Sequence, residues 1–431
     1  MTKRITFLHT ADLHIGAPIR GFGNLTEEWE ARLQEAIPAA FDRVIDLAIA
    51  RGVDFVVVAG DAFDITKPSY GDHRRFFEGL DKLDGAGIPT YLVAGNHDPS
   101  ASWGNDVGLL PPSAHLLGTD GPSYTMFSRD GEPLCLIGAR GYRNQAWPVD
   151  ESISEGISRE RIAAALRSEN PEVDAAPFSI GVVHTGLDLD QSKAYCDPRH
   201  LMQADIDYWA CGHLHKRYIR PSADAPRIAF PGCIQGRDLK ESGKRGCYIV
   251  SMEEAVGRTP RISLEFVPTA DVTFHTIKLD VSSCLTLADV NQLAVSQLFL
   301  ESGRDQCEQM VVRITLEGAT DLHAFLASPE VLSDLRRRIN DAYPKFFCDA
   351  IADRTVSRRD REAVRRGDTF TAQVLRVADQ QRVRSEETIS YVQSELVKRG
   401  IDVPASLVRR IDEFEFEAES LVMDLLEEES L

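Results

Sequence analysis

The feature that most restricts the fold of this chain is a set of short, almost uninterrupted apolar runs, such as FVVVAG at 55–60 and YLVAGN at 91–96. Runs of this kind are typical of strands in a sheet that is buried on both faces. Longer stretches with helical spacing lie between them, as in Glu27–Arg51 and Asp72–Gly85. We also expect strands at Ile5–His9, Thr90–Ala94, Leu134–Ala139, Phe178–Val183, Ile228–Phe230, Cys247–Ser251 and Ile262–Val267, the last three with antiparallel pairing. The pattern predicts a mixed α/β domain over residues 1–268.

Beyond residue 268 the apolar pattern becomes that of a smaller unit. Strand and helix patterns alternate from Thr273 to Ile351, which predicts a second, α+β domain over residues 269–351. We expect residues 352–431 to be helical throughout. A chain of 431 residues is too long for one ordinary core, so a division into three parts agrees with its length.

The C-terminal segment carries an apolar stripe on an acidic background. Leu407, Ile411, Phe414 and Leu425 recur at helical spacing, and residues 412–429 hold nine acidic and no basic side chains. Such a stripe packs either on its own domain or on a partner protein. The residues alone leave both interpretations open.

The bulk composition fits a soluble globular protein, with 43% hydrophobic and 27% charged residues. No apolar run approaches the ~20 residues needed to cross a bilayer, and the N-terminal MTKRITFLHT turns polar too early for a signal peptide. We therefore expect a cytoplasmic protein that does not bind membranes. Its eight cysteines are scattered, and we expect them to be buried thiols.

Metal-capable residues follow directly on five of the buried-type strands. The motifs are FLHTADLHIG, FVVVAGDAFD, YLVAGNHDP, FSIGVVHTG and IDYWACGHLH. They supply the side chains of Asp12, His14, Asp61, Asp64, Asn96, His97, Asp98, His184, His213 and His215. Ligands in α/β folds collect beyond the carboxyl ends of strands, so we expect these five loops to share one crevice.

Each motif alone is weak evidence, because an Asp or Asn after a strand is usually a turn former. Together, however, the five loops hold five of the eleven histidines, which turn formation does not explain. The other six, including His9, are interpreted as structural.

The set of ligands indicates which metals fit. Carboxylates, imidazoles and one carboxamide, without thiolate, suit Mn²⁺, Fe or Mg²⁺ better than structural zinc. There are more ligands than one ion needs, so we expect two divalent ions about 3.5–4 Å apart, bridged by an aspartate. Such a pair can activate a water and stabilise an in-line displacement at phosphorus.

The order D-x-H, GDxxD, GNHD, a single His and GHxH resembles that of the calcineurin-like metallophosphoesterase superfamily. The stretches GDAFDITKPS, YWACGHLHKR and GCIQGRDLKESGKRGCYIV look like its DNA-repair exonuclease branch, to which the nuclease subunit of the bacterial SbcCD complex belongs. The similarity covers about residues 4–250. It implies a four-layer α/β/β/α sandwich, a small capping domain at 269–351 that shapes the DNA groove, and a helical C-terminal segment.

Carried over position by position, the resemblance implies two ligand sets. One ion would be held by Asp12, His14, Asp61 and His215, and the other by Asp61, Asn96, His184 and His213, with Asp61 as the bridge. His97 would face the scissile phosphate and stabilise the transition state or protonate the leaving oxygen, with Asp98 as its orienting carboxylate. Asp64 would support the site from outside the ligand sets or be structural, and Lys67 would meet the substrate backbone.

The function that the resemblance implies is Mn²⁺-dependent hydrolysis of DNA in repair, as a 3′–5′ exonuclease with single-strand endonuclease activity. The implied partners are DNA bound without sequence preference, a second copy of the chain, and an SMC-like coiled-coil ATPase bound by the C-terminal helices. Because the net charge is −19, affinity for DNA has to come from bound cations and local positive charge.

Two other functions stay open. One is a phosphatase or phosphodiesterase that acts on a small-molecule or protein phosphate, since the same metal site would serve it. The other is a non-catalytic scaffold that recruits an ATPase, against which the complete ligand set argues.

Overall fold

The computed structural model describes residues 3–23, 25–64, 68–255, 259–307, 309–358, 366–367, 369–382, 390–391, 394–396 and 398–399. The chain divides into two compact units. The first consists of Met1–Thr276, Phe299–Val312 and Pro344–Asp349, and the second of Ile277–Leu298, Arg313–Tyr343 and Ala350–Leu431. All the predicted site residues belong to the first unit. Lys67 and the stripe within 407–425 lie outside the described residues.

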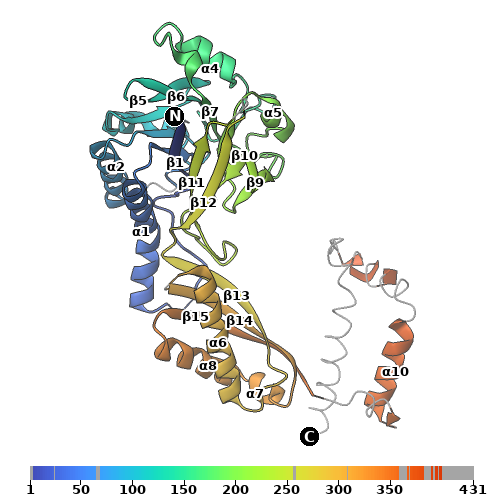
Figure 1. The fold of residues 1–431 in the computed structure, drawn as a ribbon. Coiled ribbons are helices and arrows are strands. Elements are labelled where there is room, and N and C mark those ends of the chain that lie inside the picture. The colour runs from blue at the N-terminus through green and yellow to red at the C-terminus, as the bar shows by residue number, and fades with distance from the viewer. Residues whose placement is uncertain are drawn as a thin grey trace. The chain divides into compact units, whose positions relative to one another are not determined.

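The first unit contains two six-stranded sheets (Figure 1). The order of one sheet is β12-β11-β1-β2-β3-β4. Its strands are β1 (Arg4–Thr10), β2 (Phe55–Ala59), β3 (Thr90–Val93), β4 (Ala114–Leu117), β11 (Gly246–Glu253) and β12 (Arg261–Pro268). Strands β1 to β4 are parallel, whereas β11 pairs antiparallel with both β1 and β12.

The order of the other sheet is β5-β6-β7-β8-β10-β9. Its strands are β5 (Ser123–Arg129), β6 (Glu132–Arg140), β7 (Phe178–His184), β8 (Tyr208–Gly212), β9 (Tyr218–Ser222) and β10 (Ala225–Phe230). The four central strands are parallel, and the edge strands β5 and β9 are antiparallel to their neighbours. The expectation that β10 pairs antiparallel with β11 is therefore wrong, because β10 joins this sheet next to β8.

Alternate residues of one apolar run enter different cores, which explains why the run is continuous. Val56 and Val58 of β2 pack with Phe41 on the helical side of their sheet. Phe55 and Val57 face the other way, into the core between the two sheets. Because successive side chains of a strand point to opposite faces, a strand between two apolar layers has no polar position.

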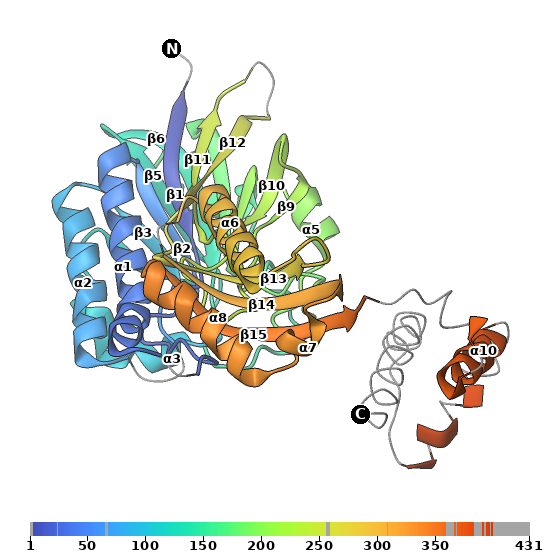
Figure 2. The same ribbon diagram turned by 90° about the horizontal axis from the view of Figure 1, so that it is seen from below.

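Helices close the outer face of each sheet (Figure 2). Helices α1 (Glu27–Arg51) and α2 (Tyr70–Gly85) share a core with the first sheet, and α4 (Arg159–Leu166) and α5 (Pro198–Gln203) share one with the second. Short helices α3 (Ser100–Trp103), η1 (Gly104–Leu109) and η2 (Val173–Ala175) lie in connecting segments. The predicted four-layer arrangement of helices, sheet, sheet and helices is confirmed.

A third sheet has the order β13-β14-β15, and the unit boundaries cut through its strands β13 (Val272–Asp280), β14 (Gln309–Thr320) and β15 (Phe346–Ser357). The remaining described helices are α6 (Leu287–Asp305), α7 (His323–Leu326), α8 (Pro329–Ala342) and α10 (Phe370–Arg382). The expectation of helix from residue 352 is wrong for 352–357, where β-branched Thr355 and Val356 continue the strand. Within the described residues, none of the helices combines the length and apolarity needed to cross a bilayer.

Replacing Trp209 by alanine should lower the free energy of unfolding by about 3–5 kcal/mol. The indole is fully buried, and its Nε1–H donates to Leu201 O at 3.0 Å. It packs directly on Gly181, where a Cβ would lie 2.3 Å from the ring. Urea denaturation measures the change. Val149, which is 97% exposed, provides the control, and its replacement by alanine should stay within about 0.5 kcal/mol. Equal stability of the two variants would contradict this account of the core.

Candidate metal centre

The structure brings the five motif loops together at the carboxyl ends of parallel strands. The loops that follow β1, β2 and β3 carry the candidates from Asp12 to Asp98, and His184 is the last residue of β7. His213 and His215 follow β8 in the other sheet. The site therefore lies where the two sheets meet, and both contribute side chains to it.

Four of the candidate ligands have left-handed backbone conformations. The φ angles of Asp12, His14, Asp61 and His213 are 51°, 48°, 52° and 103°. Each such residue costs roughly 1–3 kcal/mol and persists only where its surroundings fix it. Here the loops after β1 and β2 hold each other, since the N–H of Asp12 donates to Gly60 O and that of His14 to Asp61 O, both at 3.0 Å.

Two glycines allow these loops to approach closely. A Cβ on Gly60 would lie 2.3 Å from His184 Nδ1, and a Cβ on Gly95 would lie 2.0 Å from Asp61 Oδ1. Any larger residue at either position would push a candidate ligand out of place.

The first group of metal-capable atoms comes from Asp12, His14 and His215, whose donor atoms lie within 4.8 Å of one another. The two Nε2 atoms of the histidines are only 2.9 Å apart. Nδ1 of His215 contacts the Glu241 carboxylate, so its Nε2 carries the lone pair when the ring is neutral. Burial lowers the pKa of His14 and favours its neutral form. A positive charge, on a proton or a metal ion, is needed between the two nitrogens.

The second group consists of Asp12, Asp61 and His184. His184 donates its Nδ1–H to Ala59 O at 2.9 Å, which turns Nε2 toward Asp61 Oδ2 at 3.3 Å and Asn96 Oδ1 at 3.2 Å. Burial opposes both charged forms, yet the attraction between the two groups raises the pKa of His184 to about 9 and holds the pKa of Asp61 below its usual range. Three acceptor atoms that face one another likewise fit a cation.

The two groups adjoin around Asp61. Its Oδ2 is 3.3 Å from Nε2 of His184 and 3.8 Å from Nε2 of His14. This position between the groups agrees with the predicted bridge, although Asp12 also belongs to both groups.

His213 lies at the edge of the site. Among the described residues it belongs to none of the groups of converging donor atoms. Its Nε2 is 3.1 Å from Asp190 Oδ2, and its backbone N–H donates to both carboxylate oxygens of Asp12 at 3.1 Å. Its role as a metal ligand stays a prediction.

The expectation that Asp98 orients His97 is wrong. Nδ1 of His97 lies 2.9 Å from Asp64 Oδ1, so Asp64 is the orienting carboxylate. Asp98 points the other way and is buried. It accepts hydrogen bonds from the backbone N–H groups of Ala62, Phe63 and Gly95 at 2.8–3.3 Å, and thereby joins the loops after β2 and β3.

Arg237 and Glu241 are site residues that the sequence did not indicate. Arg237 lies 3.6 Å from Asp64 Oδ1 and 3.7 Å from Glu241 Oε1, and so connects the carboxylates behind His97 and His215. Both come from an irregular loop, and neither follows a strand. The only signal was the i, i+4 spacing of opposite charges, which is common on surfaces.

Comparison with known proteins identifies the family. Residues 5–217 match the family described as Calcineurin-like phosphoesterase, and residues 274–356 match the one described as Metallophosphoesterase YhaO, middle domain. The protein named Uncharacterized metallophosphoesterase YhaO from Bacillus subtilis is 30% identical over 321 residues, which cover 74% of this chain and 73% of that protein. The chain belongs to the calcineurin-like metallophosphoesterase family.

Two other relatives of this metallophosphoesterase carry names from DNA metabolism. DNA double-strand break repair protein Mre11 from Thermoplasma acidophilum is 29% identical, with 60% of this chain and 65% of that protein covered. The SbcD component of the nuclease SbcCD from Bacillus subtilis is 26% identical, with 48% and 56% covered. The chain thus spans less than two thirds of both proteins. Members of the family bind two divalent metal ions, and the two groups of donor atoms fit that number.

Proposed function

We propose that this metallophosphoesterase hydrolyses phosphodiester bonds of DNA in a reaction that depends on two divalent ions, most readily Mn²⁺. The observation that carries the proposal is the convergence of two buried donor groups around Asp12 and Asp61, with the partly exposed His97 beside them. The names of the two nuclease relatives favour DNA over other phosphate esters.

The side chains of Asp12, His14, His184 and His215 would hold the ions, with Asp61 between them and Asn96 and His213 completing the sets. When bound, the ions supply Lewis acidity toward the phosphate and an activated water. Buried donors in strained loops keep this arrangement in place before substrate arrives, so little reorganisation is needed during reaction.

His97 would act on the substrate itself. Its side chain is 30% exposed, and Nδ1 is engaged by Asp64, so Nε2 is the nitrogen left to contact a phosphate oxygen or the leaving group. Asp64 fixes the tautomer and orientation of the ring. Arg237 in turn holds Asp64, which makes it a positioning residue.

The finer points belong to the same proposal. They are 3′–5′ exonuclease and single-strand endonuclease activity, a DNA-repair role, a homodimer, an SMC-like ATPase partner, and the division into a nuclease domain (1–268), a capping domain (269–351) and a helical partner-binding segment (352–431). The alternative is a phosphatase or phosphodiesterase for a small-molecule or protein phosphate. Its support is the YhaO relative, whose name specifies no substrate.

The test is a metal-dependent assay on matched substrates. The purified chain is incubated with end-labelled oligonucleotides, with bis(p-nitrophenyl) phosphate and with p-nitrophenyl phosphate, in Mn²⁺, Mg²⁺, Fe²⁺ or EDTA. We expect the oligonucleotide to be degraded with Mn²⁺ and to stay intact with EDTA. An Asp61→Asn variant purified in the same way controls for contaminating nucleases. Hydrolysis of the small esters with intact DNA would assign the alternative function.

A further inference from the structure

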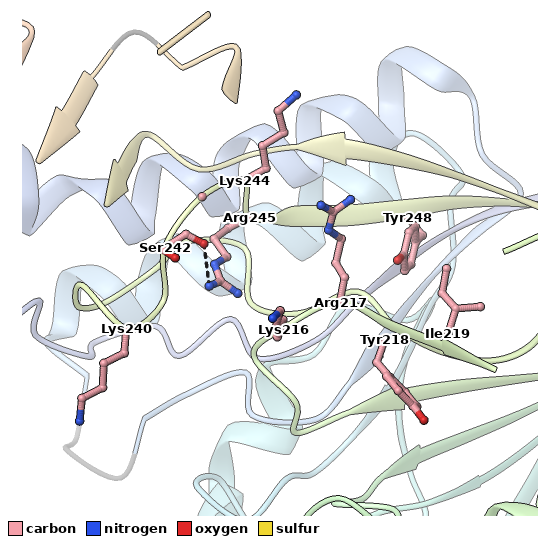
Figure 3. Close-up of a pocket in the computed structure, with 10 residues that line it drawn as sticks. Lys216, Arg217, Tyr218, Ile219, Lys240, Ser242, Lys244, Arg245 and Tyr248 are labelled. Carbon is pink, nitrogen blue, oxygen red and sulfur yellow. Dashed lines mark hydrogen bonds between the residues drawn. The ribbon is translucent and has the colours of Figure 1, made fainter. Parts of the chain in front are cut away.

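A strongly basic pocket lies beside the metal centre and has no role in the chemistry described so far (Figure 3). It has a volume of about 500 Å³. Its cationic lining residues are Lys216, Arg217, Lys240, Lys244 and Arg245. None of its lining residues carries a carboxylate. In a chain of net charge −19, five cations around one cavity form a marked local exception.

The walls of the pocket are fixed by the same loops that hold His215. Arg245 is buried, and its guanidinium donates to the backbone carbonyl oxygens of His215, Glu241 and Ser242. Arg217 lies over the ring of Phe266, with its guanidinium carbon 3.9 Å from the ring centroid. These contacts rigidify the cavity without neutralising it, since carbonyl oxygens and an aromatic face carry no net charge.

The three lysines are available to a ligand. Lys216, Lys240 and Lys244 form no ion pair with any other described residue. Like charges held around one cavity repel each other, and an anion between them removes that repulsion. The pocket therefore fits a ligand with negative charge.

The directions of the side chains favour an extended anion over a single small one. Figure 3 shows Arg217 and Lys244 reaching toward the same side of the pocket, whereas Lys240 extends the opposite way. One phosphate group cannot contact all of them. A strand with successive phosphates can, and Lys216 directly follows His215 in the chain, so such a strand would continue from the metal centre.

We propose that this pocket binds backbone phosphates of the substrate strand outside the bond that is cleaved, an inference that rests on the proposed function. The contacts involve charge alone, so they position a strand without reading its bases.

The test uses the full chain with Lys216→Ala and Lys244→Ala combined. Binding of a fluorescent single-stranded oligonucleotide is measured by anisotropy in EDTA between 50 and 200 mM salt. Each lost phosphate contact should reduce the slope of log K against log salt by about 0.7, so the double variant should lose about 1.4. The ratio of oligonucleotide turnover to bis(p-nitrophenyl) phosphate turnover in Mn²⁺ should fall about tenfold, since one decade corresponds to the loss of a modest charged contact.

The matched control combines Arg74→Ala and Lys82→Ala on helix α2, which change the charge equally but do not line the pocket. Its salt slope should equal that of the wild type. A chain that neither binds nor cleaves DNA overturns the proposed function together with this inference. DNA cleavage with a salt slope unchanged in the pocket variant overturns this inference alone, and calorimetric binding of inorganic phosphate to that pocket would then assign it to a free anion.

Discussion

Replacement of Gly95 by alanine is expected to lower phosphodiester hydrolysis by about 100-fold, because a displacement near 1 Å at a reacting centre has that effect. The added Cβ would lie 2.0 Å from Asp61 Oδ1 and 2.4 Å from Asp61 N, so both the side chain and the backbone of the central aspartate have to move. Turnover of bis(p-nitrophenyl) phosphate and metal content by mass spectrometry measure the effect. We expect fewer than two bound ions per chain.

Gly85→Ala is the matched control, because no atom lies within 4 Å of a Cβ built at Gly85. Its activity and metal content should equal those of the wild type. Full activity of Gly95→Ala with both ions bound would show that the loops after β2 and β3 can separate without disturbing the donor atoms.

The second large effect is expected for His97→Ala, which should lose about 10²- to 10⁴-fold of hydrolysis while both ions stay bound. The reason is that Nδ1 of His97 is engaged by Asp64, at the side of the two donor groups that adjoin around Asp61. Asp64→Asn should reproduce part of the loss in kcat with little change in KM. His200→Ala, a substitution at an exposed histidine of α5, controls for the loss of an imidazole.

Metal analysis decides between two roles for His97. His97 also lies near His14 and Asp64, and the three donor atoms are within 4.8 Å of one another. Loss of an ion from His97→Ala would make this trio a ligand set and would refute the role of His97 toward the substrate.

The positions of the candidate ligands could be predicted because they follow from strand periodicity. A run such as FVVVAG identifies a strand buried on both faces, and parallel strands present their carboxyl ends at one edge. Asp61 is then placed by its distance from the end of β2, without knowledge of any contact.

The supporting contacts could not be predicted in this way. Asp98 adjoins His97 in the chain, yet the two side chains diverge, and the contact to His97 comes from Asp64, 33 positions earlier. Adjacency in a loop does not determine direction, because one left-handed residue reverses it. Glu241 and Arg237 come from a loop without periodicity, so only the fold reveals them.

The left-handed conformations of Asp12, His14, Asp61 and His213 have a further consequence. The strands on either side, not the ions, compensate for the energy of these conformations, since the strained loops hydrogen-bond to each other in the polypeptide itself. Loading and unloading of cations thus becomes an exchange on a finished scaffold, unlike in a zinc finger, where the ion builds the fold. A protein of this type can be stripped and recharged, or swap one metal for another as supply changes, without passing through an unfolded chain.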